Sequence, residues 1–135
     1  MENPSIMNHV SLGVTDAGRS FAFYDAVLAT IGAQRIVSED DVVAYGKMFP
    51  EFWVHGATFD GGAPAVANGV HFSFFATSRE MVQAFYDTAL ANGGTSDGEP
   101  GPRPQYGDPY YGCFVRDPDG HKLEATFWDA PPPDM

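Results

Sequence analysis

The tetrapeptide Ala-Phe-Tyr-Asp occurs twice in this chain, at residues 22–25 and 84–87, and it belongs to a longer internal repeat. The offset of 62 positions (84 − 22) that superposes the two tetrapeptides also aligns His9 with His71, Ser11 with Ser73, Leu28 with Leu90 and Gly32 with Gly94. An internal repeat constrains the architecture strongly, because each copy is expected to form the same structural unit. Two copies are too few for an open solenoid, so the chain is predicted to fold as a closed pair of modules.

Each copy of the repeat opens with a strand pattern and continues with a helix pattern. Residues 6–14 and 70–75 show the alternation of side chains that is typical of a half-buried strand. Asp16 and Ser78 stand where they can cap the helices that follow, and glycines after each periodic apolar segment are expected to end those helices. Further strands are expected near residues 34–37, 42–47, 51–58, 111–116 and 122–128.

These elements predict an α+β fold made of two βαβββ modules. The modules are placed at about residues 6–60 and 69–129 of a single domain that spans 1–135. The turn-rich stretch DGGAPAVANG separates them and is interpreted as a linker. A second stretch rich in Gly and Pro, SDGEPGPRPQYGDPY, is interpreted as a long loop before the last two strands. A chain of 135 residues is long enough to bury a substantial core.

The charge and cysteine content exclude several classes of function. The formal net charge of −11 would repel nucleic acid and anionic membranes, and no cluster of Lys or Arg offsets it. No stretch reaches membrane-spanning length, and the N-terminus lacks the pattern of a signal peptide. The single cysteine, Cys113, excludes an internal disulfide framework and is expected to be a small core residue. We therefore expect a cytoplasmic protein whose partners are small molecules or other proteins, with no nucleic acid and no membrane among them.

Two histidines and a glutamate are the candidate ligands of a metal ion. His9 and His71 are equivalent under the repeat, near the start of the first strand of each copy, and Glu124 lies on the last predicted strand. The alternation in these strands places all three side chains opposite the face expected to pack on the helices. Imidazole and carboxylate groups bind borderline and hard divalent metals. The alternative is that these residues occupy the solvated face of a sheet, where polar side chains need no function.

Three segments resemble the vicinal oxygen chelate superfamily: HVSLGVTDAGRSFAFYDAVL, HFSFFATSREMVQAFYDTAL and YYGCFVRDPDGHKLEATFW. This superfamily contains glyoxalase I, extradiol dioxygenases, fosfomycin-resistance thiol transferases and bleomycin-binding proteins. The resemblance covers nearly the whole chain, and DPDG followed by a glutamate four residues later is its most specific part. It implies two βαβββ modules whose sheets curl around a cleft, and one divalent metal ion (Zn, Mn, Fe, Ni or Co) held by His9, His71 and Glu124. It also implies a homodimer, since modules of this superfamily commonly pair between chains.

One position departs from the pattern of glyoxalase I. That enzyme usually supplies a fourth ligand, a glutamate, from the last strand of the first module, whereas the segment EFWVHG places Trp53 there. The indole of Trp53 has no lone pair for a metal and is expected to form a wall of an aromatic pocket. His55 lies two residues further along the same strand face and replaces the missing ligand only if the register shifts. The remaining two histidines and one glutamate resemble the ligand set of the dioxygenase and fosfomycin-modifying branches.

The loop rich in Gly and Pro adds candidate substrate contacts. The segment GPRPQYGDPYYG brings four side chains close in sequence to the last two strands: Arg103, Tyr106, Tyr110 and Tyr111. An arginine there can bind a carboxylate or phosphonate, and tyrosines can stack on a ligand or donate hydrogen bonds to it. The alternative is that Pro and Tyr only stiffen a surface loop. His121, in the DPDGH turn, is expected to be structural or solvated.

The resemblance and the candidate ligands favour a metal-dependent enzyme of the glyoxalase/dioxygenase type, a lyase or a dioxygenase, that acts on a small oxygen-chelating substrate. The paired histidines and the final glutamate support that hypothesis. The alternative is a metal-free protein that binds and sequesters a small molecule, as the bleomycin-resistance branch does with its antibiotic. The acidic surface, the 14% aromatic content and the missing fourth ligand support this alternative.

Overall fold

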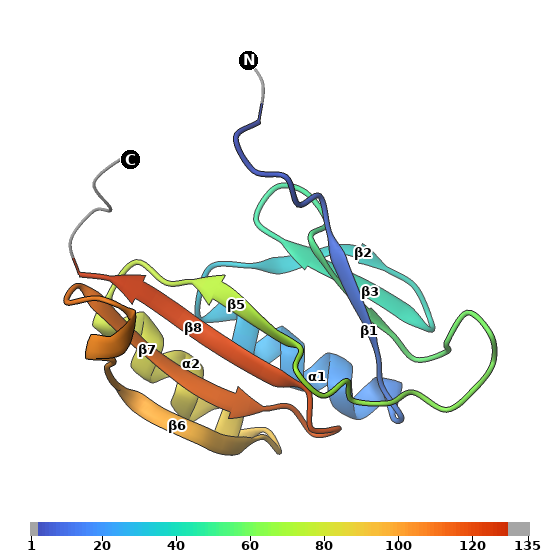
Figure 1. Ribbon diagram of the computed structural model, residues 1–135. Coiled ribbons are helices and arrows are strands. Elements are labelled where there is room, and N and C mark those ends of the chain that lie inside the picture. Colours follow the sequence, from blue (N-terminus) through green and yellow to red (C-terminus); the bar gives the residue numbers. More distant parts are fainter. Residues whose placement is uncertain (1–2, 130–135) are drawn as a thin grey trace.

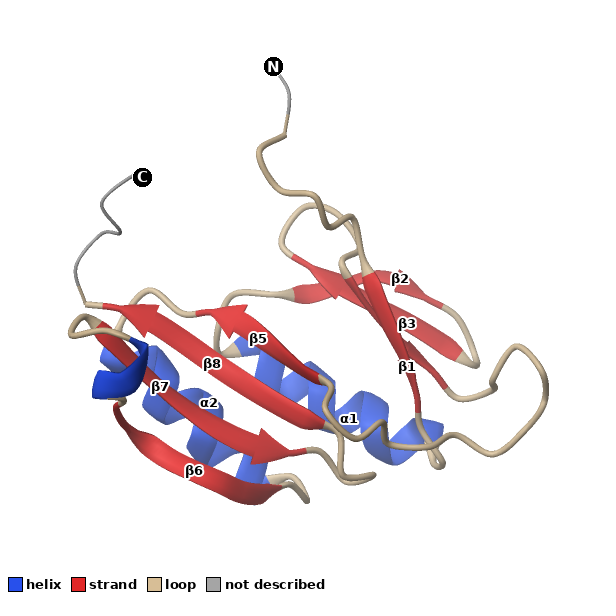
Figure 2. Cartoon of the chain, viewed as in Figure 1, coloured by secondary structure: helices blue, strands red, loops and turns tan. Residues whose placement is uncertain are grey.

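The computed structural model describes residues 3–129 and contains two βαβββ modules, which confirms the predicted α+β fold (Figure 1, Figure 2). Residues 1–2 and 130–135 of the predicted domain lie outside the described residues. The first module contains β1 (Val10–Gly13), α1 (Ala17–Ala29), β2 (Gln34–Ser38), β3 (Val42–Gly46) and β4 (Phe52–His55). The second module contains β5 (His71–Phe75), α2 (Arg79–Ala91), β6 (Thr95–Pro102), the short 3-10 helix η1 (Pro104–Tyr106), β7 (Tyr110–Arg116) and β8 (Lys122–Trp128).

The two modules build two separate four-stranded sheets with the same topology. The strand orders are β1-β4-β3-β2 and β5-β8-β7-β6, so the repeat in the sequence corresponds to a repeat in the fold. In each sheet the first and last strands of the module pair in parallel, and the other pairs are antiparallel. The sheets stay open and do not close into a barrel. Figure 2 shows that α2 covers one face of the second sheet and leaves its other face open.

One hydrophobic core lies on the helix side of both sheets. Leu12 and Val14, from the predicted apolar face of the first strand, are 8% and 0% exposed. The Phe52 ring on β4 meets the rings of Phe72 and Phe74 on β5 edge-on, at centroid distances of 5.6 and 5.1 Å. The two modules therefore share this core, and full burial of each large apolar side chain contributes about 1.5–3 kcal/mol. Polar side chains available for function must lie on the open faces or between the modules.

The predicted helix caps are confirmed. The Asp16 side chain accepts a hydrogen bond from the backbone N–H of Arg19 at 3.1 Å, and the Ser78 hydroxyl accepts one from Met81 at 3.1 Å. Gly93, which follows α2, has a φ of 97°, a left-handed conformation that favours glycine. These local signals place each helix directly after the first strand of its module. No helix within residues 3–129 is long and apolar enough to cross a membrane.

The loop predicted from residue 96 onwards is only partly a loop. Its first residues belong to β6, which is the edge strand of the second sheet. Glycine and proline interrupt the alternation that predicts a strand, and the pairing of β6 with β7 shifts register around Gly98 and before Gly101. An edge strand tolerates such residues because one side of its backbone needs no partner in the sheet. The prediction of a structureless stretch here was therefore wrong.

A buried aspartate in the DPDG turn is bonded to both modules. The Asp117 carboxylate accepts hydrogen bonds of 2.9 Å from the backbone N–H groups of residues 119–121, and one of 2.6 Å from the hydroxyl of Tyr24 on α1. Asp117 is 3% exposed and Tyr24 is 0% exposed. Burial, together with the neighbouring Asp117, raises the pKa of Tyr24, so its hydroxyl remains a donor. This turn of the second module is thereby tied to the first module.

Two more residues of the same turn bind the connection between β1 and α1. Asp119 Oδ1 accepts hydrogen bonds from the backbone N–H and the hydroxyl of Thr15, at 3.1 and 2.6 Å. His121 Nε2 lies 2.7 Å from the carbonyl oxygen of Gly13. A carbonyl oxygen only accepts hydrogen bonds, so His121 Nε2 carries the proton. His121 is therefore structural, in agreement with one of the two roles expected for it.

We expect the stability of the protein to fall as the pH rises above about 9. Burial raises the pKa of the Cys113 thiol from 9.0 to about 12, and burial also raises the pKa values of Tyr24 and Tyr45. The folded state holds these protons at a pH where the unfolded chain releases them. Their contribution to stability is therefore complete below the unfolded pKa values and is lost as the pH rises toward the folded ones.

Urea unfolding between pH 7 and 11 measures this effect. The midpoint is expected to fall progressively above about pH 9, while the dependence of the free energy on urea stays unchanged. Replacing Cys113 by alanine removes one of the titrating groups and is expected to make the decline shallower. A midpoint that stays constant up to pH 11 would contradict the assignment of these groups as buried and protonated.

Candidate functional site

Polar side chains gather on the open face of the second sheet, opposite α2. On β8, Leu123 and Ala125 are fully buried on the helix side, so Glu124 between them points to the open face. β5 pairs in parallel with β8 and brings His71 to this face. β7 lies on the other side of β8 and brings Tyr110 to it. Three neighbouring strands thus deliver an imidazole, a phenol and a carboxylate to one place.

The Glu124 carboxylate is held by three protein donors. The Tyr110 hydroxyl donates to Oε2 at 2.5 Å, the Thr126 hydroxyl donates to the same oxygen at 3.0 Å, and His71 Nε2 donates to Oε1 at 3.0 Å. Glu124 is 7% exposed, whereas the side chain of His71 is 45% exposed. Burial and the hydrogen bond to Glu124 raise the pKa of Tyr110, so its hydroxyl remains a donor. The cluster is a fixed, buried anionic acceptor with an accessible imidazole at its edge.

This cluster lies in a cleft of about 830 Å³, a size suited to a small-molecule ligand. The rings of Tyr106 and Tyr110 meet edge-on with centroids 5.1 Å apart, and Tyr110 also meets Trp128 edge-on at 5.8 Å. Phe114 of β7 lines the cleft as well. The cleft therefore combines an aromatic wall with one buried carboxylate, Glu124, which suits a ligand that has both an apolar body and a polar end.

The other predicted loop residues reach the cleft to different degrees. Arg103 lines it, but its guanidinium donates to three backbone carbonyl groups at the end of β6, at 2.7, 3.1 and 3.2 Å. These bonds occupy the guanidinium with the backbone that directly precedes it. Tyr111 follows Tyr110 on β7 and so faces the opposite side, where it packs against the core with the guanidinium of Arg79 4.6 Å from its ring. Tyr111 is not brought to this cleft.

The first sheet carries the remaining predicted site residues on its own open face. The ring of His9 lies 6.1 Å from that of Trp53, and Trp53 stacks on His55 at 6.2 Å with 17° between the ring planes. His9 Nδ1 is 2.6 Å from the side-chain oxygen of Asn8. The indole Nε1 of Trp53 is buried without a hydrogen-bond partner among residues 3–129. His9 therefore stands beside an aromatic stack on a different sheet from Glu124.

The structure brings together two of the three predicted metal ligands. His71 Nε2 and Glu124 Oε1 are 3.0 Å apart. Two ligand atoms bound to one tetrahedral Zn²⁺ at about 2.0–2.2 Å are separated by about 3.3–3.6 Å, so this pair accepts one ion once it opens by a few tenths of an ångström. No group of three His, Cys, Asp or Glu side chains within the described residues is placed to hold a metal. One chain does not complete the ligand set, because His9 and His71, although equivalent under the repeat, belong to separate sheets.

Two members of the cluster, Ser73 and Thr126, are not among the site residues predicted from the sequence. Their hydroxyl oxygens lie 2.6 Å apart, and Thr126 also donates to Glu124. Two signals pointed to them: the repeat aligns Ser73 with Ser11, and Thr126 follows Glu124 by two residues on the same strand face. Hydroxyl groups at such positions are common on solvated sheet faces, and these two are distinguished by the bond from Thr126 to the buried Glu124 carboxylate and by the contact of Ser73 with Thr126.

A sequence model of one protein family matches most of the chain. The model of the Glyoxalase/Bleomycin resistance protein/Dioxygenase superfamily matches residues 6–125. No match was found among curated proteins.

Several solved structures share the fold. A glyoxalase/bleomycin resistance protein from Albidiferax ferrireducens is 35% identical, with a TM-score of 0.84 over 91% of this chain and 99% of that chain. A lactoylglutathione lyase from Agrobacterium tumefaciens is 17% identical, with a TM-score of 0.63 over 96% and 97% of the two chains. The fosfomycin resistance protein FosX from Listeria monocytogenes is 20% identical, with a TM-score of 0.65 over 91% and 93%. At these lower identities the likeness concerns the fold alone.

Proposed function

This chain belongs to the Glyoxalase/Bleomycin resistance protein/Dioxygenase superfamily, and we propose that it is a metal-dependent enzyme of the glyoxalase/dioxygenase type acting on a small substrate with adjacent oxygen atoms. The Glu124 cluster carries this proposal. It is a buried carboxylate on an open sheet face, oriented by Tyr110 and Thr126, with the accessible imidazole of His71 beside it. Groups that are oriented before a ligand arrives need little reorganisation during a reaction.

His71 and Glu124 would hold the metal ion. A divalent ion (Zn, Mn, Fe, Ni or Co) would polarise a substrate carbonyl or stabilise an oxyanion as negative charge develops. His71 Nε2 would lose its proton and replace its hydrogen bond to Glu124 Oε1 by a bond to the ion, since a ligating imidazole is neutral at the bound nitrogen. Tyr110 would keep the carboxylate oriented through Oε2 during this exchange. The rings of Tyr106 and Trp128 would pack against the apolar part of the substrate.

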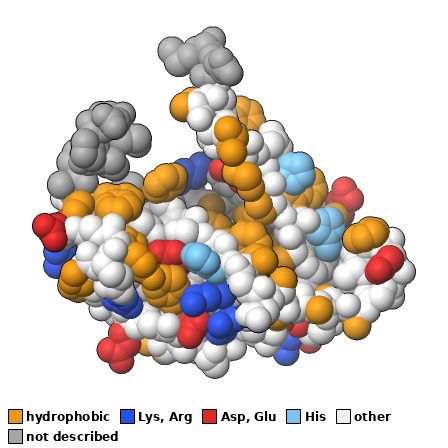
Figure 3. Space-filling model, in the orientation of Figure 1, with side chains coloured by type: hydrophobic (Ala, Val, Ile, Leu, Met, Phe, Trp, Pro, Cys, Tyr) orange, Lys and Arg blue, Asp and Glu red, His pale blue; other side chains and the backbone are white. Residues whose placement is uncertain are grey.

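We further propose a homodimer in which His9 of the partner subunit completes the ligand set. His9 is exposed and lies directly before β1 of the first sheet. His71 and Glu124 lie on the second sheet, and within residues 3–129 of one chain His9 does not join them in a metal-binding group. Ile6 and Met7 precede His9, and they are 97% and 61% exposed. Figure 3 shows hydrophobic side chains along this segment before β1. Large exposed apolar side chains next to a candidate ligand favour a protein interface.

A second candidate function is metal-free binding and sequestration of a small molecule, such as a bleomycin-type antibiotic. The Glu124 carboxylate already has protein donors on both oxygens, and residues 3–129 of one chain bring no third ligand to it. The stacked rings of Trp53 and His55 offer a surface on the first sheet against which an aromatic ligand can pack. The net charge of −11 suits a cationic ligand.

Metal analysis tests the proposal first. Protein purified without chelator is expected to contain about one divalent ion per chain, and His71→Ala is expected to lose it, because His71 is the imidazole that the chain itself places beside Glu124. His55→Ala serves as the matched histidine control, because its ring stacks on Trp53 on the other sheet. Equal, substoichiometric metal in the wild type and His71→Ala would contradict the metal site.

Turnover separates the branches of the proposal. The metal-loaded protein is assayed with the hemithioacetal of methylglyoxal and glutathione, with fosfomycin plus a thiol, and with catechols. Metal-dependent turnover of one of these, lost in His71→Ala, is the expected result. Tight binding of a bleomycin-type compound without metal and without turnover would instead support the second candidate function.

A further inference from the structure

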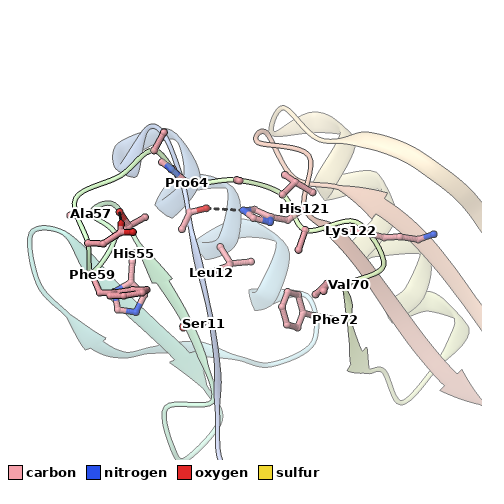
Figure 4. A pocket seen from close by; sticks show the side chains of 17 residues that line it. Ser11, Leu12, His55, Ala57, Phe59, Pro64, Val70, Phe72, His121 and Lys122 are labelled. Atoms are coloured by element: carbon pink, nitrogen blue, oxygen red, sulfur yellow. Dashed lines mark hydrogen bonds between the residues drawn. The ribbon is translucent and has the colours of Figure 1, made fainter.

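A second cleft lies between the two modules, beneath residues 57–67, which comprise the end of the first module and most of the linker. Its volume is about 660 Å³, within the range of small-molecule sites. β1 and β4 line one side, β5 and the turn that carries His121 line the other, and the linker covers it (Figure 4). Among the lining residues only Lys122 is shared with the Glu124 cleft, and its ammonium group is 3.5 Å from Asp97 and 4.9 Å from the ring centroid of Phe114. The two clefts are therefore chemically separate.

His121 contributes an oriented hydrogen-bond acceptor to this second cleft. The residue is 7% exposed, and its Nε2 donates to the carbonyl oxygen of Gly13 at 2.7 Å (Figure 4). In the neutral ring the proton on Nε2 leaves the lone pair on Nδ1. Among the described residues Nδ1 of His121 has no hydrogen-bond partner. Within the same residues Trp53 Nε1 is the one side-chain atom that is both fully enclosed and unpaired, so His121 Nδ1 keeps some accessible surface. The Nδ1 lone pair is therefore open to a ligand.

The rest of the lining is mostly apolar. Leu12 and Phe72 reach it from the two first strands, and Pro64 and Val66 reach it from the linker. Asp60, at the linker, is a carboxylate whose pKa is lowered by hydrogen bonds from the backbone of residue 62 and from a threonine hydroxyl. This fixed negative charge disfavours an anionic ligand, as does the net charge of −11.

We propose that this inter-module cleft binds a neutral apolar compound with a hydroxyl group, of which a phenol is the simplest example. The hydroxyl donates to Nδ1 of His121, and the ring packs against Leu12 and Phe72. His121 is more than nine-tenths buried, and its unpaired Nδ1 gains a hydrogen bond when the ligand binds. The ring of the ligand and the apolar side chains that it contacts are removed from water at the same time. The ligand contacts both modules, so its binding also stabilises their mutual arrangement. This proposal is independent of the metal and of the reaction proposed above.

The test compares 4-methylphenol with its methyl ether, 4-methylanisole, in the presence of a chelator. Both are titrated into isotopically labelled full-length protein and followed by NMR. 4-Methylphenol is expected to shift the signals of Leu12, Phe72 and the His121 ring in a saturable manner. 4-Methylanisole, which has no hydroxyl donor, is expected to bind about 10-fold more weakly, the ratio that corresponds to one net hydrogen bond.

Two variants make the test specific. Ala57→Phe introduces a bulky side chain at an exposed lining position and is expected to weaken both probes equally, without loss of a buried polar group. His121→Phe is expected to abolish the preference for the phenol; if it does not fold, the comparison of the two probes on the wild type still decides. Equal affinities for both probes, or shifts confined to the residues around Glu124, would overturn the proposal.

Discussion

Replacing Asp117 by alanine is expected to lower the free energy of unfolding by about 3–5 kcal/mol, because it removes the acceptor of a buried network. Three backbone N–H groups and the Tyr24 hydroxyl donate to this carboxylate. Tyr24 is 0% exposed, so water cannot replace the lost acceptor at its hydroxyl. A buried donor left without a partner costs about 1–3 kcal/mol, and the turn also loses the bonds that shape it. The two modules lose one of their polar connections at the same time.

Urea unfolding of Asp117→Ala beside Tyr24→Phe separates the parts of this effect. Tyr24→Phe removes the donor to Oδ2 and leaves the three backbone donors on Oδ1, so its expected cost is about 1–3 kcal/mol, below that of Asp117→Ala. A double variant is expected to cost less than the sum of the two, since both substitutions remove the same hydrogen bond. If Asp117→Ala costs no more than Tyr24→Phe, the turn does not depend on its carboxylate and the network is less important than its geometry indicates.

This network also shows where prediction from the sequence stopped. The DPDG stretch predicts a tight turn, because its turn residues act locally. Its partners Tyr24 and Thr15 lie far away in the sequence, on the first module. No local pattern encodes a contact over such a separation. The role of the turn as a connection between modules therefore became visible only in the structure.

The repeat predicted the fold well because it acts on whole modules. Equal spacing of strand and helix patterns in both copies led to the same strand order in both sheets. The same equivalence could not show which residues meet. His9 and His71 hold corresponding positions in the two copies of the repeat, and for that reason they lie on two different sheets. Glu124 contacts His71 because β5 and β8 are neighbours in one sheet.

The loop region was the least predictable part. Its glycines and prolines hide β6, whose pairing with β7 needs register shifts that no alternation pattern records. Because successive side chains of a strand point to opposite faces, the two adjacent tyrosines of β7 lie on different sides of the sheet. Tyr110 donates to Glu124 on the open face, whereas Tyr111 packs against the core. The predicted loop ended at Tyr110 and the predicted strand began at Tyr111, so the alternation of faces between the two residues was missed and both were assigned to one pocket.

His9→Ala and His71→Ala are each expected to weaken metal binding by at least about 100-fold, yet a mixture of the two variants is expected to recover tight sites. The proposed site joins His9 of one chain to His71 and Glu124 of the other. A mixed dimer then has one site with both substitutions and one site with neither. After random exchange of subunits, about one quarter of all sites in the mixture are intact. A site formed within one chain would give no recovery, because every chain carries a substitution in its own ligand set.

A mixture of His71→Ala with Glu124→Gln provides the matched control. These residues lie on the same sheet and are 3.0 Å apart, so each site of their mixed dimer keeps one substitution whichever chain supplies His9. This mixture is expected to remain weak under both arrangements. Calorimetric titration with Zn²⁺ counts the tight sites, and mass spectrometry of the native dimers shows that subunits have exchanged. If mixed dimers form and His9→Ala with His71→Ala recovers no tight sites, the shared site is excluded, and the incomplete ligand set of the single chain then favours metal-free binding.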